Sequence, residues 1–318
     1  MAERDRIARF FAPLTAGESG SFNLTDDAAI LDIPAGHQLV ITTDSVIVGI
    51  HVLADATAQQ CAQKLVRRNL SDLAAMGAKP WRYSLNIHTP HHVGDDWFAA
   101  FAATLAAEQK TFDMLLIGGD STSGGHAIHT TLTCFGLVKT GAALRRNGAH
   151  VGDDIYVSGT IGDAALALQL LQQNGSAPQH FFNRYHRPEP RLHVGAALHG
   201  LATAAIDISD GLVADIAAVC AASGVGATLE TSRIPLSPML QQLVTNDAPI
   251  WDLILAGGDD YELAFTAPAS SRAALQKLSA ELSLALTCIG HITKEKDVRV
   301  VDENGAIIPI IHAGWEHA

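Results

Sequence analysis

The sequence predicts an α/β protein of two domains. Its 318 residues correspond to about two domains of ordinary size. Segments with the period of a strand alternate with longer segments that have the period of a helix, on both sides of a stretch at 140–153 that is rich in glycine and arginine. With 48% hydrophobic and 17% charged residues, the chain can form two buried cores. We expect one domain at 1–140 and the other at 150–318.

The elements of the first domain follow from periodicity and from glycine and proline positions. Residues 3–13 have helical periodicity, and a long helix at 57–76 is expected to end at Gly77 and Pro80. The remaining expected elements are strands at 28–33 and 38–43, a strand at 83–88, a helix at 95–109, a strand at 114–117 followed by a Gly-Gly-Asp loop, and a strand at 128–138.

The second domain continues the alternation of strands and helices. A proline-rich stretch at 178–190 is expected to be a loop. The expected elements are strands at 155–158, 204–208 and 225–230, strands near 261–266, 287–291 and 298–301, and helices at 163–172, 191–201 and 211–222.

The composition limits the possible functions. A net charge of −12 argues against a surface for nucleic acid or anionic membranes, because such surfaces need clustered Lys and Arg. The N-terminus is charged and lacks a signal-type apolar segment, and no window is apolar enough to span a membrane, so we expect a cytoplasmic protein. Four cysteines without a C-x-x-C pair disfavour zinc and dithiol redox sites: Cys61, Cys134, Cys220 and Cys288.

Aspartates recur at the ends of apolar runs. Carboxylates brought together in one fold repel each other unless cations neutralise them. The pattern therefore indicates a site for several hard divalent ions, most plausibly Mg²⁺ with a polyphosphate, and hence phosphoryl transfer. Five places share this pattern, namely Asp26-Asp27, Thr42-Thr43-Asp44, Gly118-Gly119-Asp120, Asp207-Ile208-Ser209-Asp210 and Gly257-Gly258-Asp259-Asp260, and a sixth aspartate is Asp72.

Asp72 falls in the predicted helix at 57–76. Asn69 and Asp72 lie within its apolar arc, where an unpaired carboxylate would be costly. Asp72 should therefore meet an arginine or a metal, unless it reaches water at the end of the helix. The apolar arc consists of Ala58, Cys61, Ala62, Leu65, Val66, Leu73 and Met76, and the opposite arc of Gln60, Gln63, Lys64, Arg67 and Ser71.

Each of the other places also has a purely structural interpretation. Thr42-Thr43-Asp44 and Gly118-Gly119-Asp120 could be turns, although the glycines would also let backbone amides approach a phosphate. Ser209 or Asp210 could cap the helix that follows. Arg145-Arg146 could clamp a phosphate or could be exposed linker charge.

Familiar nucleotide-binding motifs are missing from the sequence. It contains no Walker A loop, no G-x-G-x-x-G turn, and neither the H-R-D nor the D-F-G motif of protein kinases. His91-His92 and His126-x-x-His129 lack a coherent zinc spacing, and we expect exposed or strand-face histidines there.

Taken together, the motifs resemble those of the thiamine-monophosphate kinase family. This family belongs with aminoimidazole ribonucleotide synthetase and selenophosphate synthetase in a superfamily of ATP-using enzymes. The similar segments span nearly the whole chain in order. They are DDAAIL from Asp26, TTDSVIVGIH from Thr42, NLSDLAAMGAKP from Asn69, GGDSTSG from Gly118, SGTIGDAALAL from Ser158, DISDGL from Asp207 and GGDDYEL from Gly257.

The resemblance implies a two-domain fold like that of aminoimidazole ribonucleotide synthetase, with mixed sheets flanked by helices. It also implies a homodimer built largely through the N-terminal domains. ATP and several Mg²⁺ ions are expected in a cleft between the domains. Two groups of aspartates are expected to face this cleft, one from the first domain (27, 44, 72 and 120) and one from the second (207, 210 and 259). The implied metal ligands are Asp27, Thr42, Thr43, Asp44, Asp72, Asp120, Asp207 and Asp210, of which Asp44, Asp72, Asp120 and Asp210 are expected to be catalytic. The implied ATP contacts are Gly119, Asp120, Arg145 and Ser209, and the implied thiamine-phosphate contacts are His51, Asp259 and Trp315.

The implied reaction is the phosphorylation of thiamine monophosphate to thiamine diphosphate by ATP. The substrate phosphate would attack the γ-phosphorus in line, without a strong general base and without a phosphoenzyme. Another enzyme of the superfamily is the nearest alternative. However, no cysteine precedes Cys61 and the chain does not end in cysteine, which disfavours the selenophosphate and hydrogenase-maturation members. A non-catalytic nucleotide- or metal-binding module is the other alternative.

Overall fold

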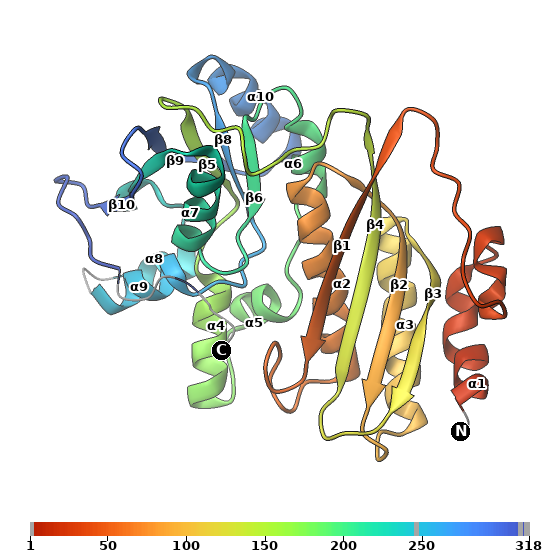
Figure 1. Ribbon diagram of the computed structural model, residues 1–318. Helices are drawn as coiled ribbons and strands as arrows, with labels where there is room; N and C mark the ends of the chain where they lie inside the picture. Colours follow the sequence, from red (N-terminus) through yellow and green to blue (C-terminus); the bar gives the residue numbers. More distant parts are fainter. Residues whose placement is uncertain (1–2, 245–247, 311–313, 315–318) are drawn as a thin grey trace. The chain divides into compact units, whose positions relative to one another are not determined.

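The computed structural model of the chain describes residues 3–244, 248–310 and 314. Its contacts form two units, one of residues 1–73 and 78–141, the other of residues 74–77 and 142–318. Each unit contains one sheet with its own helices (Figure 1). Among the described residues, no helix is both long enough and apolar enough to cross a membrane.

The first unit is built on a four-stranded sheet in the order β1-β4-β2-β3. Strands β1 and β2 run antiparallel to β4, whereas the edge strand β3 runs parallel to β2. Helices α2 and α3 cover one face of this sheet (Figure 1). The bounds are β1 (His37–Ile47), α2 (Ala58–Ala75), β2 (Lys79–Thr89), α3 (Asp95–Phe112), β3 (Leu115–Ser123) and β4 (His129–Lys139).

A short N-terminal segment runs beside the edge strand β3. It consists of α1 (Glu3–Arg6), a π-helical turn (Ile7–Phe11) and two 3₁₀ turns (Ala12–Thr15 and Ser19–Leu24). The two 3₁₀ turns contact β3 directly. This segment and β3 thus line a cavity at the edge of the sheet.

The sheet of the first unit has one buried and one open face. Along β4, alternate residues from Thr130 to Val138 are buried, whereas their neighbours are partly exposed. Gly136 belongs to the buried set, and a Cβ atom there would lie 2.9 Å from a methyl group of Leu73 on α2. The helices therefore pack closely on this face, and the other face is not covered by the described residues of its own unit.

Helix α2 has buried residues on both of the arcs described from its sequence, the apolar one and the opposite one. Lys64, Arg67 and Ser71, which form part of the predicted polar arc, are at most 1% exposed. Arg67 pairs with the buried Glu108 of α3, its Nε atom 2.9 Å from Oε2. At Arg67, pairing with a carboxylate of the neighbouring helix α3 thus replaces the solvent.

The second unit has a six-stranded sheet in the order β10-β7-β9-β5-β8-β6. β10 is parallel to β7, and the other neighbours are antiparallel. The strands are β5 (Asp154–Ser158), β6 (Ala204–Asp207), β7 (Gly226–Glu230), β8 (Leu263–Ala267), β9 (Leu286–Thr293) and β10 (Val298–Val301). The helices are α4 (Asp163–Asn174), α5 (Gln179–His186), α6 (Leu192–Ala197), α7 (Leu212–Ser223), α8 (Pro238–Leu243), α9 (Ala248–Ala256) and α10 (Arg272–Leu282).

The core of the second unit is centred on its middle strands. The rings of Tyr156 on β5 and Phe265 on β8 stack with their centroids 5.3 Å apart. Val194 of α6 and Leu275 of α10 belong to the same buried cluster. Helix α7 contacts β6, β7, β8 and β10, and only residues 208–211 separate its start from the end of the edge strand β6. This attachment positions the loop that carries Asp210.

Four of the sequence predictions are wrong. Residues 28–33 form no strand, and Ile30 is 66% exposed while its amide donates to the carbonyl of Gly20. The stretch at 178–190 contains helix α5 instead of being only a loop. Gly118-Gly119-Asp120 lies inside β3, and Thr42-Thr43-Asp44 lies in the middle of β1, because strand pairing continues through both segments.

The buried Arg67–Glu108 pair gives a stability prediction. Arg67→Met leaves an uncompensated buried carboxylate and should lower the free energy of unfolding by about 3–5 kcal/mol. Arg67→Met/Glu108→Leu removes both charges and should recover most of that loss. Urea unfolding at pH 7 measures both variants. Equal losses in the single and double variants would contradict this role for the pair.

Candidate active site

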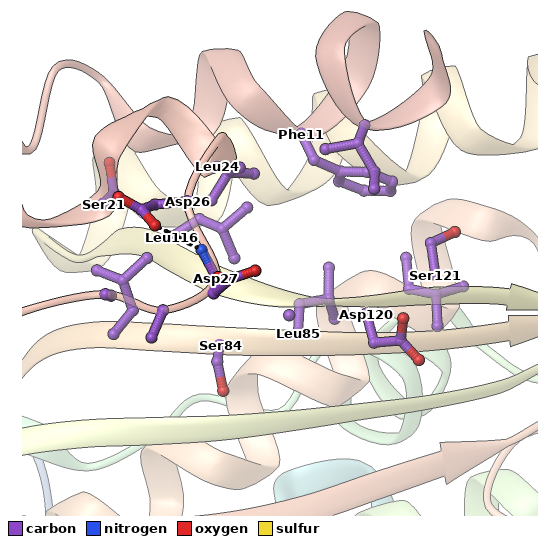
Figure 2. Close-up of a pocket in the computed structure, with 17 residues that line it drawn as sticks. Phe11, Ser21, Leu24, Asp26, Asp27, Ser84, Leu85, Leu116, Asp120 and Ser121 are labelled. Carbon is purple, nitrogen blue, oxygen red and sulfur yellow. Dashed lines mark hydrogen bonds between the residues drawn. The ribbon is translucent and has the colours of Figure 1, made fainter. Parts of the chain in front are cut away.

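A cavity of about 370 Å³ in the first unit collects several of the predicted site residues. It lies between the N-terminal segment and strands β2 and β3 (Figure 2). Asp27 lines it together with Gly119 and Asp120, which are far from Asp27 in the sequence. The lining residues are Ile7, Phe11, Ser21, Leu24, Asp26, Asp27, Ala28, Ala29, Ser84, Leu85, Ile87, Leu116, Ile117, Gly118, Gly119, Asp120 and Ser121.

Gly119 has a packing reason for being glycine. Its φ is +151°, and a Cβ atom built on it would lie 1.8 Å from the carbonyl oxygen of Leu85 on β2. Only glycine allows the two parallel strands to approach so closely. The strand thereby continues to Asp120, whose side chain is exposed at the edge of the sheet. The phosphate contact expected for Gly119 stays a prediction.

Asp120 projects from the open face of the sheet together with a row of polar side chains. It pairs in register with Asn86, which in turn is opposite Thr131, which is opposite Ser45. The hydroxyl oxygens of Ser45 and Thr131 are 2.7 Å apart. Thr43 lies two residues before Ser45 on β1 and so belongs to the same face. This face thus carries a row of a carboxylate, an amide and hydroxyls.

Thr42, Asp44 and Asp72 lie on the opposite face, next to α2. The Thr42 hydroxyl donates a short hydrogen bond to the Asp72 carboxylate. Arg68 forms a two-point ion pair with Asp44, its Nε and Nη2 atoms 3.0 and 3.2 Å from the carboxylate oxygens. The amide of Asp44 donates to the side-chain carbonyl of Asn69 at 3.1 Å. The polar residues within the apolar arc of α2 are therefore used to hold β1.

Carboxylate and hydroxyl oxygens are the ligands that Mg²⁺ prefers. Within residues 3–244, 248–310 and 314, however, no three side chains of His, Cys, Asp or Glu gather into a metal-binding group. Mg²⁺ commonly binds through one or two carboxylates, several waters and substrate phosphates. The donors present therefore fit ions that arrive with a polyphosphate, rather than ions held in a cage made only of protein.

In the second unit, two predicted loops are joined by backbone hydrogen bonds. The amide of Asp259 donates to the carbonyl of Ser209, and the amide of Tyr261 to that of Ile208, both at 2.8 Å. Asp207 is buried at the end of β6, whereas the Asp210 side chain is exposed. The loop with Ser209 and Asp210 thus lies directly against the loop with Asp259.

Helix α7 is not capped as one interpretation of the sequence expected. Its N-cap residue is Gly211, and neither Ser209 nor Asp210 caps it with a side chain. Instead, Oδ2 of Asp215 accepts the amides of Ser209, Asp210 and Gly211 at 3.0, 3.1 and 3.2 Å. Burial and the nearby charge of Asp210 raise the pKa of Asp215 to about 7, although the three amides oppose that shift. Asp215 was not among the site residues predicted from the sequence.

Asp260 supports the neighbouring loop in a similar way. Its side chain is buried, and both carboxylate oxygens lie 3.0 Å from the amide nitrogen of Gly162, at the start of α4. Burial raises the pKa of Asp260 to about 8, and the Arg184 guanidinium acts in the opposite direction. From the sequence, a role was predicted for the partly exposed Asp259 of this doublet but not for Asp260.

Glu262 ends this loop in a buried cluster of charges. Arg191 binds its carboxylate through Nε and Nη2, and an Nη2 atom of Arg184 lies 3.0 Å from Oε1. The hydroxyl of Ser158 donates to the same carboxylate at 2.6 Å. Two arginines within and beside a predicted proline-rich loop were the only sequence signal for this cluster. The start of β8 is thereby fixed to α5 and to β5.

Three predicted site residues remain, namely His51, Arg145 and Trp315. His51 accepts the amide of Ile47 at Nδ1, at 3.1 Å, directly after β1. Arg145 has an exposed side chain, and its carbonyl accepts the amide of Ala205 at 3.0 Å. Trp315 lies outside the described residues.

The raised pKa of Asp260 gives a prediction for stability against pH. The folded state holds a proton up to pH about 8, whereas the unfolded chain loses it near pH 4. The folded state therefore loses stability relative to the unfolded state as pH rises from about 4 to about 8. Asp260→Asn does not titrate and keeps an acceptor for Gly162, so its stability relative to wild type should increase between pH 5 and pH 8.5.

Denaturant unfolding at both pH values measures this effect. Asp113→Asn is the matched control, because Asp113 is exposed, pairs with Lys79 and has a lowered pKa, so it titrates below this window. A stability difference between wild type and Asp260→Asn that is the same at pH 5 and 8.5 would contradict the buried, protonated state of Asp260.

Comparison with known families covers most of the chain. Residues 25–138 match the family described as AIR synthase related protein, N-terminal domain, and residues 150–303 match its C-terminal domain. The predicted two-domain α/β fold, similar to that of aminoimidazole ribonucleotide synthetase, is confirmed by these matches.

Individual relatives are similar over nearly their full lengths. The thiamine-monophosphate kinase of Salmonella typhimurium is 38% identical over 320 residues, which cover 98% of this chain and 96% of that protein. A crystal structure of the thiamine-monophosphate kinase from Stenotrophomonas maltophilia K279a is 40% identical, with a TM-score of 0.84 over 93% of this chain and 94% of that one. AaThiL complexed with AMPPCP and TMP is 26% identical, with a TM-score of 0.77 over 95% and 98% of the two chains.

Proposed function

The chain belongs to the thiamine-monophosphate kinase family, and we propose that it transfers the γ-phosphate of ATP to thiamine monophosphate, which yields thiamine diphosphate and ADP. The observation that carries this proposal is the cavity that Asp27, Gly119 and Asp120 line together. The relative AaThiL, solved with AMPPCP and TMP, supports it as well.

ATP is proposed to bind through Gly119, Asp120, Arg145 and Ser209. The cavity at β3 supports the first two contacts, since it has both apolar walls and carboxylates. Mg²⁺, when bound with ATP, would neutralise negative charge on the phosphate oxygens. The residues proposed to hold it are Asp27, Thr42, Thr43, Asp44, Asp72, Asp120, Asp207 and Asp210, and Asp44, Asp72, Asp120 and Asp210 are proposed to be catalytic.

Thiamine monophosphate is proposed to contact His51, Asp259 and Trp315. His51 has one ring nitrogen engaged by the amide of Ile47, which orients the ring. The carboxylate of Asp259 accepts a hydrogen bond from the Tyr261 hydroxyl at 2.9 Å, which restricts where this side chain can point.

The proposed transfer is direct. A phosphate oxygen of thiamine monophosphate attacks the γ-phosphorus with its lone pair, and the bond from that phosphorus to the β–γ bridging oxygen breaks as ADP leaves. A phosphate nucleophile is already ionised near neutral pH, so no strong general base has to remove a proton from it. The residues proposed above accordingly act by binding, orienting and balancing charge.

We further propose that the enzyme is a homodimer in the cytoplasm. The open sheet face of the first unit supports this assembly, because it carries the 59% exposed Ile41 next to the partly exposed Phe135. A second copy covering this face would remove that apolar surface from water. Among the described residues the cysteines are all unpaired, which fits a reducing compartment.

The proposed roles of the aspartates can be tested by the formation of thiamine diphosphate from thiamine monophosphate, ATP and Mg²⁺. Asp120→Asn and Asp44→Asn should each lower kcat by about 100-fold or more, because each removes a carboxylate proposed to hold Mg²⁺ at the phosphates. Asp113→Asn is the control, since Asp113 is exposed just before β3 and its left-handed backbone tolerates asparagine. No product from the wild-type protein would refute the proposed function.

Direct transfer predicts that no phosphate becomes attached to the protein. Wild-type enzyme incubated with γ-labelled ATP, with and without thiamine monophosphate, should carry no covalent label after denaturation. The same reaction should yield labelled thiamine diphosphate. A labelled protein that passes its label to thiamine monophosphate would overturn the direct mechanism.

A further inference from the structure

We propose that Asp215 is a positioning residue that fixes the loop carrying Ser209 and Asp210 for the Mg²⁺-ATP substrate. The inference rests on the proposed function. Asp215 lies on α7 and is 5% exposed. It has no role in the phosphoryl transfer described above.

Three consecutive backbone amides converge on one oxygen of Asp215. The donors belong to Ser209, Asp210 and Gly211, at 3.0, 3.1 and 3.2 Å from Oδ2. Successive amides that point to one anion form a concave backbone arrangement, and here the anion belongs to the protein itself. The bonds fix the backbone on both sides of Asp210 while leaving its exposed side chain free of this contact.

The loop is also fixed from its other side. A Cβ atom at Gly258 would lie 2.5 Å from the carbonyl of Ser209, and one at Gly211 would lie 2.9 Å from the backbone of Ala256. The amide of Asp259 donates to the carbonyl of Ser209 as well. The segment 256–259 therefore packs directly on the loop. A change in the loop would reach Asp259, which is proposed to contact the second substrate.

Substitutions can separate the role of the Asp215 carboxylate as a hydrogen-bond acceptor from the effect of its volume. Asp215→Leu has a similar size and no acceptor, so three backbone amides lose their common partner. Asp215→Asn keeps one acceptor oxygen for them. Val219→Ala is a matched control on the same helix, because Val219 is buried and takes no part in the loop. It reports the effect of weakened packing of α7 alone.

The experiment measures thermal unfolding, kcat and the Mg²⁺ concentration for half-maximal rate, at a temperature well below every unfolding transition. Asp215→Leu should raise the half-saturating Mg²⁺ concentration and lower kcat, each by about 10-fold or more, as loss of a supporting residue behind a metal ligand typically does. Asp215→Asn should recover most of both effects. Val219→Ala should change neither, even if it unfolds at a lower temperature.

Two results would overturn the inference. One is a Mg²⁺ requirement and kcat of Asp215→Leu within about twofold of those of Val219→Ala. The other is an Asp215→Asn variant as impaired as Asp215→Leu. If the wild-type protein forms no thiamine diphosphate, the proposed function fails separately. Calorimetric titration with Mg²⁺ and a non-hydrolysable ATP analogue then compares the variants by affinity, with the same ranking expected.

Discussion

Repulsion between carboxylates is the constraint on which the rest of this structure depends. A protein that uses aspartates to bind a charged ligand must keep them apart, or compensate them, before the ligand arrives. Asp44 is compensated by the guanidinium of Arg68, and Asp72 accepts the hydroxyl of Thr42. Asp215 accepts the backbone amides of Ser209, Asp210 and Gly211, whose dipoles stabilise negative charge without adding a titratable partner. These three carboxylates thus each have a specific partner within their own unit.

The exposed carboxylates differ from these paired ones in their solvation, and this difference affects cation binding. Asp27 and Asp120 are exposed and therefore solvated, so they need no permanent counter-charge. They are also the carboxylates best able to exchange water for an incoming cation. The division explains why the described residues contain no ready-made group of three metal ligands, although the chain is rich in aspartate. Cations that come with a phosphate ligand bring part of their own coordination shell, and the protein has to supply only the remaining oxygens.

The alternation of strands and helices could be predicted from the sequence, because each sheet has a buried face with a regular period. The positions of single site residues were harder to predict. Gly118-Gly119-Asp120 has the composition of a turn, yet Gly119 serves the close approach of β3 to β2, and that pairing joins residues distant in sequence. Residues 28–33 have the composition of a strand and no strand to pair with. Asp215 was missed because an acceptor inside a helix gives no local signal for amides several residues upstream. Candidate ligands were recognisable from their motifs, whereas the residues behind them depend on tertiary contacts.

The loop from Gly258 to Glu262 shows how such support relates to function. Asp259 and Tyr261 have φ values of +62° and +51°, in the left-handed region that costs a non-glycine residue about 1–3 kcal/mol when it is strained. Asp260, which lies between them, accepts the amide of Gly162, and Glu262, which follows Tyr261, is held by two arginines. The amides of Asp259 and Tyr261 donate to the neighbouring loop. These contacts over-determine the backbone, and an unfavourable conformation persists only where the surroundings enforce it. A strained segment held on every side, with one carboxylate left partly exposed, is better explained by the need to present Asp259 than by the stability of the fold.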